Sequence, residues 1–192
     1  PAYIQPKLDG VRCLAFWEGD KVKLISRAGK EWTVPSHISE QVAEVLPKDS
    51  MFDGELYIHG KSCQTITSYV KKFREVETPL VEYHIYDMPI CNGRDDQDFN
   101  TRLENLQVTF MEADEGGCRP SNLILVNTAS VQSLEDINTY ETDIVAQGYE
   151  GAIVRNSDGL YVFGYRSNDL IKIKTFQDAE FVVIGCRDGI GK

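Results

Sequence analysis

The sequence lacks several patterns that would place it in a common functional class. Its five cysteines are odd in number and include no C-x-x-C pair, which argues against both a disulfide framework and a zinc knuckle. Neither G-x-G-x-x-G nor G-x-x-x-x-G-K-[ST] occurs, so a Rossmann or P-loop device for holding a nucleotide is excluded. No apolar run approaches the roughly 20 residues of a membrane span. We therefore expect reduced thiols and an intracellular protein that does not bind membranes.

Basic residues are also scarce. The chain has 20 Lys and Arg against 30 Asp and Glu, a formal net charge of −10, which taken alone argues against binding nucleic acid through bulk electrostatics. The charge is uneven, however, because residues 1–30 sum to +3 whereas residues 81–160 sum to −11. Such a chain could bind phosphate on one face and be acidic elsewhere.

Short β-rich runs alternate with helical patterns along the 192 residues. The predicted strands are residues 2–6, 12–17, 22–26, 51–58, 81–88, 122–126, 151–155, 170–175 and 180–186. Helices are predicted at 36–46 and 62–73, after a capping box that opens at Thr101, and from Ser133 to near Gly148. Strands outnumber helices and the connections are mixed, so we expect an α+β fold with antiparallel sheets.

The most unusual segment is Lys7-Leu8-Asp9-Gly10-Val11-Arg12. A lysine becomes a nucleophile when desolvation or a cationic neighbour favours its neutral form. Gly10 allows a sharp turn or a close approach to a ligand, and Arg12 offers a fork suited to phosphate or ribose. On these six residues alone, a solvated turn with a Lys–Asp pair is the favoured explanation.

Two acids and two lysines further along the chain also have both a structural and a functional explanation. Glu55 and Glu150 stand beside apolar strand residues, and an acid in such a place is either held by partners or binds a metal. Residues 170–174 alternate strictly, so Lys172 and Lys174 project from one strand face. That face is either solvated or directed at phosphates.

Together these segments resemble the nucleotidyltransferase (adenylation) domain of ATP-dependent DNA ligases, most of all the small phage-type enzymes. The motifs follow the family's order from Gln5 to Lys174: K-x-D-G-x-R at 7–12, Ser-Arg-Ala-Gly-Lys at 26–30, D-G-E-L at 53–56, Tyr-Asp at 86–87, Glu-Gly at 150–151 and Lys-Ile-Lys at 172–174. The resemblance implies an α+β, ATP-grasp-like domain of antiparallel sheets flanked by helices. It also implies an adenylation domain at 1–184, with 185–192 starting a C-terminal OB-fold domain that is missing here.

The resemblance implies a reaction at Lys7. This lysine would attack the α-phosphate of ATP, and the AMP would pass to the 5′-phosphate of a nick in double-stranded DNA before the 3′-hydroxyl seals it. ATP and Mg²⁺ (or Mn²⁺) are the implied cofactors. Without the OB-fold domain, efficient sealing is not expected. We expect a monomer in the cytoplasm, the nucleus or a virus-infected host cell.

The resemblance also assigns roles to other positions. Gln5 would read the adenine edge by accepting and donating, Tyr86 would stack on the base, Ile153 would form the opposite wall, and Arg12 would lie near the ribose and the nick. Phosphate contacts are expected from Arg27, Arg166, Lys172 and Lys174. Glu55 would contact the ribose or a metal, and Glu150 is the best metal candidate because Mg²⁺ prefers oxygen ligands.

Three other functions remain open from the sequence. One is an RNA ligase or a capping-type guanylyltransferase, another is a nucleotide- or DNA-binding module without catalysis, and the third is a protein-interaction domain. The scattered His37, His59 and His84 predict no metal site. The basic run at 71–74 is either a contact for the DNA backbone or a solvated helix end.

Overall fold

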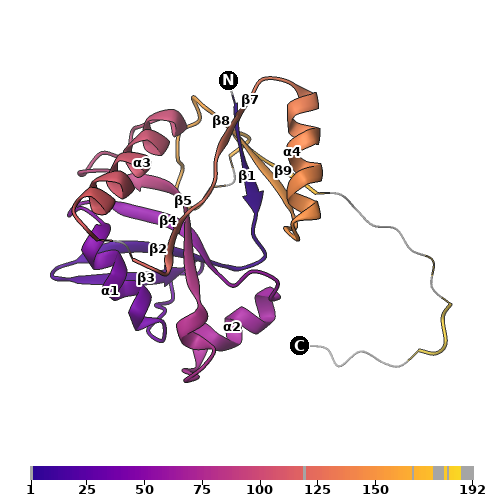
Figure 1. Cartoon of the computed structure of the whole chain (residues 1–192), viewed down its shortest axis with the longest axis horizontal. Coiled ribbons are helices and arrows are strands. Elements are labelled where there is room, and N and C mark those ends of the chain that lie inside the picture. Colours follow the sequence, from indigo (N-terminus) through magenta and orange to yellow (C-terminus); the bar gives the residue numbers. More distant parts are fainter. Residues whose placement is uncertain (1, 119, 166, 175–179, 181, 187–192) are drawn as a thin grey trace.

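The chain folds into two β-sheets, the larger packed against three helices and the smaller against a fourth, as the computed structural model shows (Figure 1). The structure describes residues 2–118, 120–165, 167–174, 180 and 182–186. In chain order the elements are β1 (Ala2–Lys7), β2 (Val11–Glu18), β3 (Lys21–Ser26), α1 (Ser36–Val45), β4 (Met51–Tyr57), α2 (Cys63–Lys71), the 3-10 helix η1 (Thr78–Leu80), β5 (Glu82–Ile90), α3 (Phe99–Glu115), β6 (Leu123–Leu125), β7 (Ala129–Val131), α4 (Leu134–Ala146), β8 (Gly151–Asn156) and β9 (Leu170–Ile173). The expected α+β class is confirmed.

The larger sheet has the strand order β3-β2-β4-β5-β6. All its neighbours pair antiparallel except β5 and β6, which are parallel. Helix α1 packs on β3, α3 packs on β5, and α2 contacts β2 and β4. Apolar side chains from these elements form the main core, among them Ile38, Val42, Phe52, Leu56, Ile85 and Leu106.

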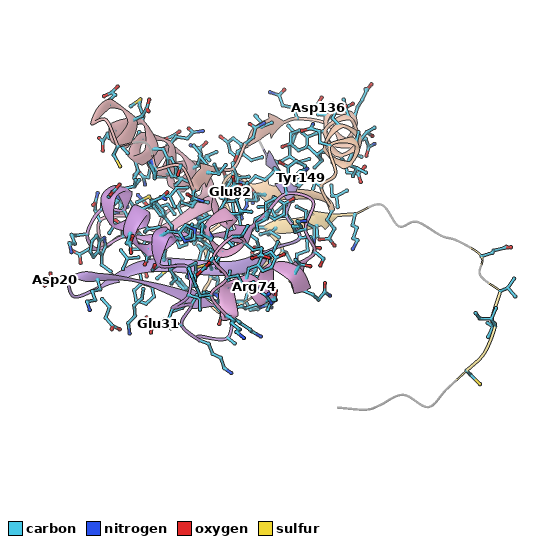
Figure 2. All side chains as sticks on the ribbon, turned by 60° about the horizontal axis from the view of Figure 1, so that its bottom comes forward. Asp20, Glu31, Arg74, Glu82, Asp136 and Tyr149 are labelled. Carbon is cyan, nitrogen blue, oxygen red and sulfur yellow. The ribbon has the colours of Figure 1, made fainter. Side chains whose placement is uncertain are left out.

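The smaller sheet has the order β7-β1-β8-β9 and is antiparallel throughout. Helix α4 packs against β1 and β8 and closes a second core, formed by Ile4, Val131, Ile144, Ala152 and Val154. Tyr149, which follows α4, packs against both cores. In Figure 2 Tyr149 lies between α4 and the larger sheet, while Asp20 and Asp136 lie far apart at the β2–β3 turn and at α4.

The segment between β1 and β2 crosses from one sheet to the other. Lys7 ends β1 in the smaller sheet and Val11 begins β2 in the larger one. A Cβ on Gly10 would lie 2.6 Å from the carbonyl oxygen of Leu56 and 2.6 Å from Cγ of Glu55. Only glycine therefore fits this crossing, and the crossing brings Lys7 to the boundary between the sheets.

Helix α3 begins earlier than predicted. It starts at Phe99, and Asp98 is its N-cap, accepting a hydrogen bond from the Thr101 amide at 2.8 Å. The predicted capping box at Thr101 is therefore wrong. The sequence predicts a solvated loop for the acidic run at residues 95–98, but its last residue, Asp98, caps the helix, because a carboxylate is a strong N-cap group. The capping box predicted at the start of α4 is confirmed, because Ser133 and Asp136 bond to each other's backbone amides.

Three other details differ from the sequence-based prediction. Strand β7 was not predicted, and it has three residues only. Residues 180 and 182–186 form no strand, although one was predicted across them. The helical pattern of the sequence predicts Leu134 inside, but Leu134 is the first residue of α4 and is 77% exposed. All five cysteines are free, and no described helix is long and apolar enough to cross a membrane.

Candidate active site

A cavity of about 400 Å³ opens at the boundary between the two sheets. Most of the residues predicted to form a site line it: Gln5, Lys7, Arg12, Arg27, Glu55, Tyr86, Glu150, Ile153 and Lys172. Lys174 is joined to this group through its ion pair with Glu150. Arg166 lies outside the described residues. The three basic residues of the run at 71–74 end or follow α2, are exposed, and do not line the cavity; they are Lys71, Lys72 and Arg74 (Figure 2 labels Arg74).

Strand register brings Lys7 to Glu150. Lys7 on β1 is paired with Gly151 on β8, and Gly151 has a φ of 151°. A Cβ there would lie 2.3 Å from the carbonyl oxygen of Ile173 on β9, so a glycine is required for β9 to approach. The result is that three strand ends place Lys7, Glu150 and Lys174 together.

Glu150 binds both lysines. Lys7 Nζ donates to Glu150 Oε2, and Lys174 Nζ donates to Glu150 Oε1 at 2.5 Å. Partial burial works to raise the pKa of Glu150, but the hydrogen bonds from Lys174 and Lys7 outweigh it and lower the pKa below its ordinary value. Glu150 is therefore a carboxylate at neutral pH and holds the Lys7 amine at the cavity wall.

Asp53 was not predicted as a site residue, although it begins the D-G-E-L motif. It is 2% exposed and accepts two hydrogen bonds from Arg12, from Nε at 3.0 Å and from Nη2 at 2.8 Å. It also accepts from the hydroxyls of Tyr161 at 2.7 Å and Tyr86 at 3.3 Å. Desolvation works against the charge on Arg12, but Asp53 raises the pKa of the guanidinium on balance. Asp53 thus fixes Arg12 beside the cavity in one orientation.

Glu55 lies two residues further along β4 and has a different character. Burial raises its pKa to about 8, and the Asp53 carboxylate adds to this effect, while Arg12 and Lys7 oppose it. At neutral pH most molecules therefore carry Glu55 as a neutral acid. A neutral carboxyl can both donate and accept a hydrogen bond, which suits a hydroxyl group better than a metal ion.

The amide of Gln5 is held by protein groups. Its Nε2 donates to the Tyr86 carbonyl oxygen at 3.1 Å and to Thr128 Oγ1 at 2.8 Å, and its Oε1 accepts from Arg155 Nε at 2.8 Å. Both amide hydrogens and one of the two oxygen lone pairs are thus used. The resemblance implies that Gln5 both donates a hydrogen bond to a base and accepts one from it. Because its NH₂ is already engaged, Gln5 can only accept a hydrogen bond from a base.

Two basic residues complete the cavity rim. Arg27 and Lys172 are exposed and line the opening, one after β3 and the other on β9. Across the described part of the chain, no three His, Cys, Asp or Glu side chains are grouped closely enough to hold a metal ion by themselves. A metal here would need oxygen ligands from a bound molecule as well.

Comparison with known proteins finds relatives whose descriptions agree with one another. The sequence model of a family described as "ATP dependent DNA ligase domain" matches residues 1–174. The chain is 29% identical to the DNA ligase of African swine fever virus (isolate Pig/Kenya/KEN-50/1950), over 97% of this chain and 44% of the viral protein. It is 24% identical to the DNA ligase of Enterobacteria phage T4, over 96% of this chain and 46% of the phage protein.

A solved structure agrees with these relatives. The Chlorella virus DNA ligase-adenylate superposes on 93% of this chain and 64% of its own, with a TM-score of 0.72 and 25% identity. The chain spans less than half the length of the two curated relatives named above.

Proposed function

The chain belongs to the ATP-dependent DNA ligase domain family, and on that premise we propose that it is the adenylation domain of such a ligase, with Lys7 as the nucleophile. The observation that carries the proposal is the position of Lys7, held by Glu150 at the wall of a cavity of about 400 Å³. Residues 1–184 form this domain, and residues 185–192 lead into an OB-fold domain.

The first step joins AMP to the protein. The Lys7 nitrogen attacks the α-phosphorus of ATP, a P–N bond forms, the bond to the β-phosphate oxygen breaks, and pyrophosphate leaves. Lys7 must lose its proton first. Glu150 is a weak base because its two lysine partners keep its pKa low, so it orients the amine while the proton passes to solvent through the cavity mouth.

Positive charge around the phosphates stabilises the transition state. Displacement at phosphorus depends mainly on alignment and on neutralising charge on the phosphoryl oxygens. Arg27 and Lys172 at the cavity rim and Lys174 beside Glu150 supply this charge. Such groups act more strongly in a partly closed cavity than in water.

The base and the ribose occupy the deeper part of the cavity. Tyr86 and Ile153 line it and provide flat and apolar surfaces for the adenine. Arg12, fixed by Asp53, faces the ribose. Glu55, neutral near pH 7, hydrogen-bonds a ribose hydroxyl.

A divalent cation, Mg²⁺ or Mn²⁺, fits this set of donors. Such ions commonly take one or two carboxylates together with substrate phosphates, and Glu150 is a cavity-lining carboxylate with a lowered pKa. Glu55 is a second ligand only when it ionises. When bound, the ion supplies charge neutralisation to the phosphates.

The later steps use nicked double-stranded DNA as the partner. The AMP moves from Lys7 to the 5′-phosphate at the nick, and the 3′-hydroxyl then displaces it to form the phosphodiester. We propose that the domain acts as a monomer inside the cell, and that the isolated 192-residue chain self-adenylylates but seals nicks poorly.

Intact mass spectrometry after incubation with ATP and Mg²⁺ tests the first step. The unaltered chain should gain the mass of one AMP group, and Lys7→Ala should not. Lys21→Ala, at an exposed lysine on β3 that does not line the cavity, is the matched control and should gain the same mass.

Each other result selects a different function. An adduct formed from GTP but not ATP would indicate a guanylyltransferase. A nucleotide-dependent rise in melting temperature without any adduct would indicate a binding module. An adduct that persists in Lys7→Ala would reject Lys7 as the nucleophile.

A further inference from the structure

A buried group of charged residues at the cavity wall has no role in the reaction described above. Asp87 on β5 is fully buried and accepts hydrogen bonds from two arginines. Arg102 on α3 donates from Nε at 2.8 Å and from Nη2 at 3.2 Å, and Arg155 on β8 donates from Nη1 at 2.9 Å. Two guanidinium groups thus share one carboxylate where the two sheets meet.

The arrangement leaves these side chains little freedom. Arg102 Nη1 also donates to the carbonyl oxygens of Gln97 at 2.7 Å and Gly159 at 3.0 Å. The Arg155 guanidinium lies 4.8 Å from the ring centre of Phe99 and 5.3 Å from that of Tyr86. Burying charge is costly unless the group is paired and hydrogen-bonded, so a network this complete holds one arrangement.

A second donor of Arg155, the Nε–H, points to Gln5. Arg155 Nε donates to Gln5 Oε1 at 2.8 Å. An arginine N–H can only donate and a backbone carbonyl can only accept. Because Gln5 has Arg155 on one side and the Tyr86 carbonyl on the other, its amide cannot turn over without placing like groups against each other twice.

We propose that Arg155 is a positioning residue that sets the nucleobase preference of the cavity by fixing the orientation of the Gln5 amide. With the amide fixed, Gln5 has one unused hydrogen-bonding position, a lone pair on Oε1. That lone pair matches a base with an amino group at position 6, as in adenine, and repels the carbonyl oxygen that guanine or hypoxanthine carries there. Asp87 and Arg102 keep Arg155 in place. This inference rests on the proposed function, since it concerns the nucleotide that Lys7 attacks.

The test compares ATP with inosine triphosphate, which has a carbonyl oxygen in place of the 6-amino group. The rate of adduct formation is measured against nucleotide concentration for the 192-residue chain, to give kcat and KM for each nucleotide. The unaltered chain should prefer ATP by at least about tenfold in kcat/KM, as expected when a buried acceptor faces another acceptor.

Arg155→Met removes the donor while keeping the length of the side chain. The preference for ATP should fall to about threefold or less, mainly through KM, because rotation of the amide is then opposed by the Tyr86 carbonyl oxygen but no longer by Arg155, and the NH₂ can turn toward the base in part of the molecules. Arg155→Lys, which can still donate to Gln5 Oε1, should keep most of the preference. Arg94→Met, at an exposed arginine that pairs with Asp96 and does not line the cavity, is the matched control and should behave like the unaltered chain.

A purely structural role for Arg155 predicts a different result. Arg155→Met would then lose activity with both nucleotides in equal proportion, and the unchanged ratio would overturn the proposal. If Arg155→Met does not fold, Gln5→Met removes the acceptor itself and must abolish the preference.

An unaltered chain that forms no adduct at all would reject the proposed function. An adduct whose ATP-to-inosine-triphosphate ratio is the same in Arg155→Met as in the unaltered chain would reject the role of Arg155 alone. Calorimetry gives the dissociation constants of the two nucleotides, and their ratio makes the same comparison for binding alone.

Discussion

Replacing Asp53 by asparagine tests whether this buried carboxylate organises the cavity. The change keeps the shape of the side chain and removes its charge. Arg12 then loses its anionic partner. Oδ1 of Asp53 accepts from Arg12 Nε and Tyr86, and Oδ2 accepts from Arg12 Nη2 and Tyr161, so in either orientation the asparagine NH₂ faces one guanidinium nitrogen and one tyrosine hydroxyl. At least one donor is left without an acceptor.

The size of the effect follows from the burial of the two partners. Breaking a fully buried ion pair costs about 3–5 kcal/mol, whereas an exposed pair contributes about 0–1 kcal/mol. The Asp53 side chain is 3% exposed but that of Arg12 is 39% exposed, so solvent compensates Arg12 in part. We expect a loss of about 2 kcal/mol, which for a chain of this size lowers Tm by about 4–8 °C.

Thermal unfolding followed by circular dichroism measures this loss, with Asp96→Asn as the control. Asp96 also pairs with an arginine, Arg94, but their side chains are 71% and 65% exposed. Its replacement should cost less than about 0.5 kcal/mol, which lowers Tm by less than about 2 °C. A drop in Asp53→Asn no larger than that of the control would refute the view that Asp53 organises the cavity.

Three further predictions address neighbouring residues. Gly10→Ala should destabilise the chain by about 2 kcal/mol, seen as a lower urea midpoint, because the new Cβ would meet the Leu56 carbonyl oxygen at 2.6 Å; an unchanged midpoint would contradict this. Folding raises the pKa of Glu55 from the ordinary 4.5 to about 8, so the stability from this bound proton is complete below pH 4.5 and lost as pH rises to about 8. Glu55→Gln should therefore gain stability relative to the unaltered chain between pH 5 and 8.5, and urea midpoints that differ equally at both pH values would exclude this. Lys174→Met should change stability by less than about 1 kcal/mol because its pair with Glu150 is half-exposed, while adduct formation by mass spectrometry falls; normal adduct formation would count against its proposed role.

The strands and most helices could be predicted because their patterns are local. Alternation and 3.6-residue spacing depend on neighbours in sequence, and so does the capping box of Ser133 and Asp136. The start of α3 was missed for the opposite reason. The residues around Asp98 are compatible both with a solvated loop and with a helix start capped through the Thr101 amide. The helix start forms because the rest of α3 packs on the sheet.

The site was predictable in the residues that carry short motifs and not in the residues that support them. Asp87 meets Arg102 and Arg155, and Arg155 meets Gln5 across 150 positions in sequence. Charged residues are mostly exposed, so an isolated arginine or aspartate in a strand gives no sign of a buried partner. Such partners are recognised only once the two sheets are brought together.

The net charge of −10 gives little guide to this cavity because charge acts over short distances in salt. At physiological ionic strength the Debye length is about 8 Å, so acids beyond that distance contribute little to a bound phosphate. Among the described residues, six basic and five acidic residues line the cavity. One of the five, Glu55, is mostly neutral near pH 7, and the buried Asp87 offsets one charge of the Arg102 and Arg155 pair, which still leaves a small positive excess. The acids at the start of α4, such as Asp136, lie at one end of the molecule (Figure 2). An acidic chain can therefore present a locally positive cavity, and its affinity for a nucleotide depends on which charges lie within one Debye length of the phosphates.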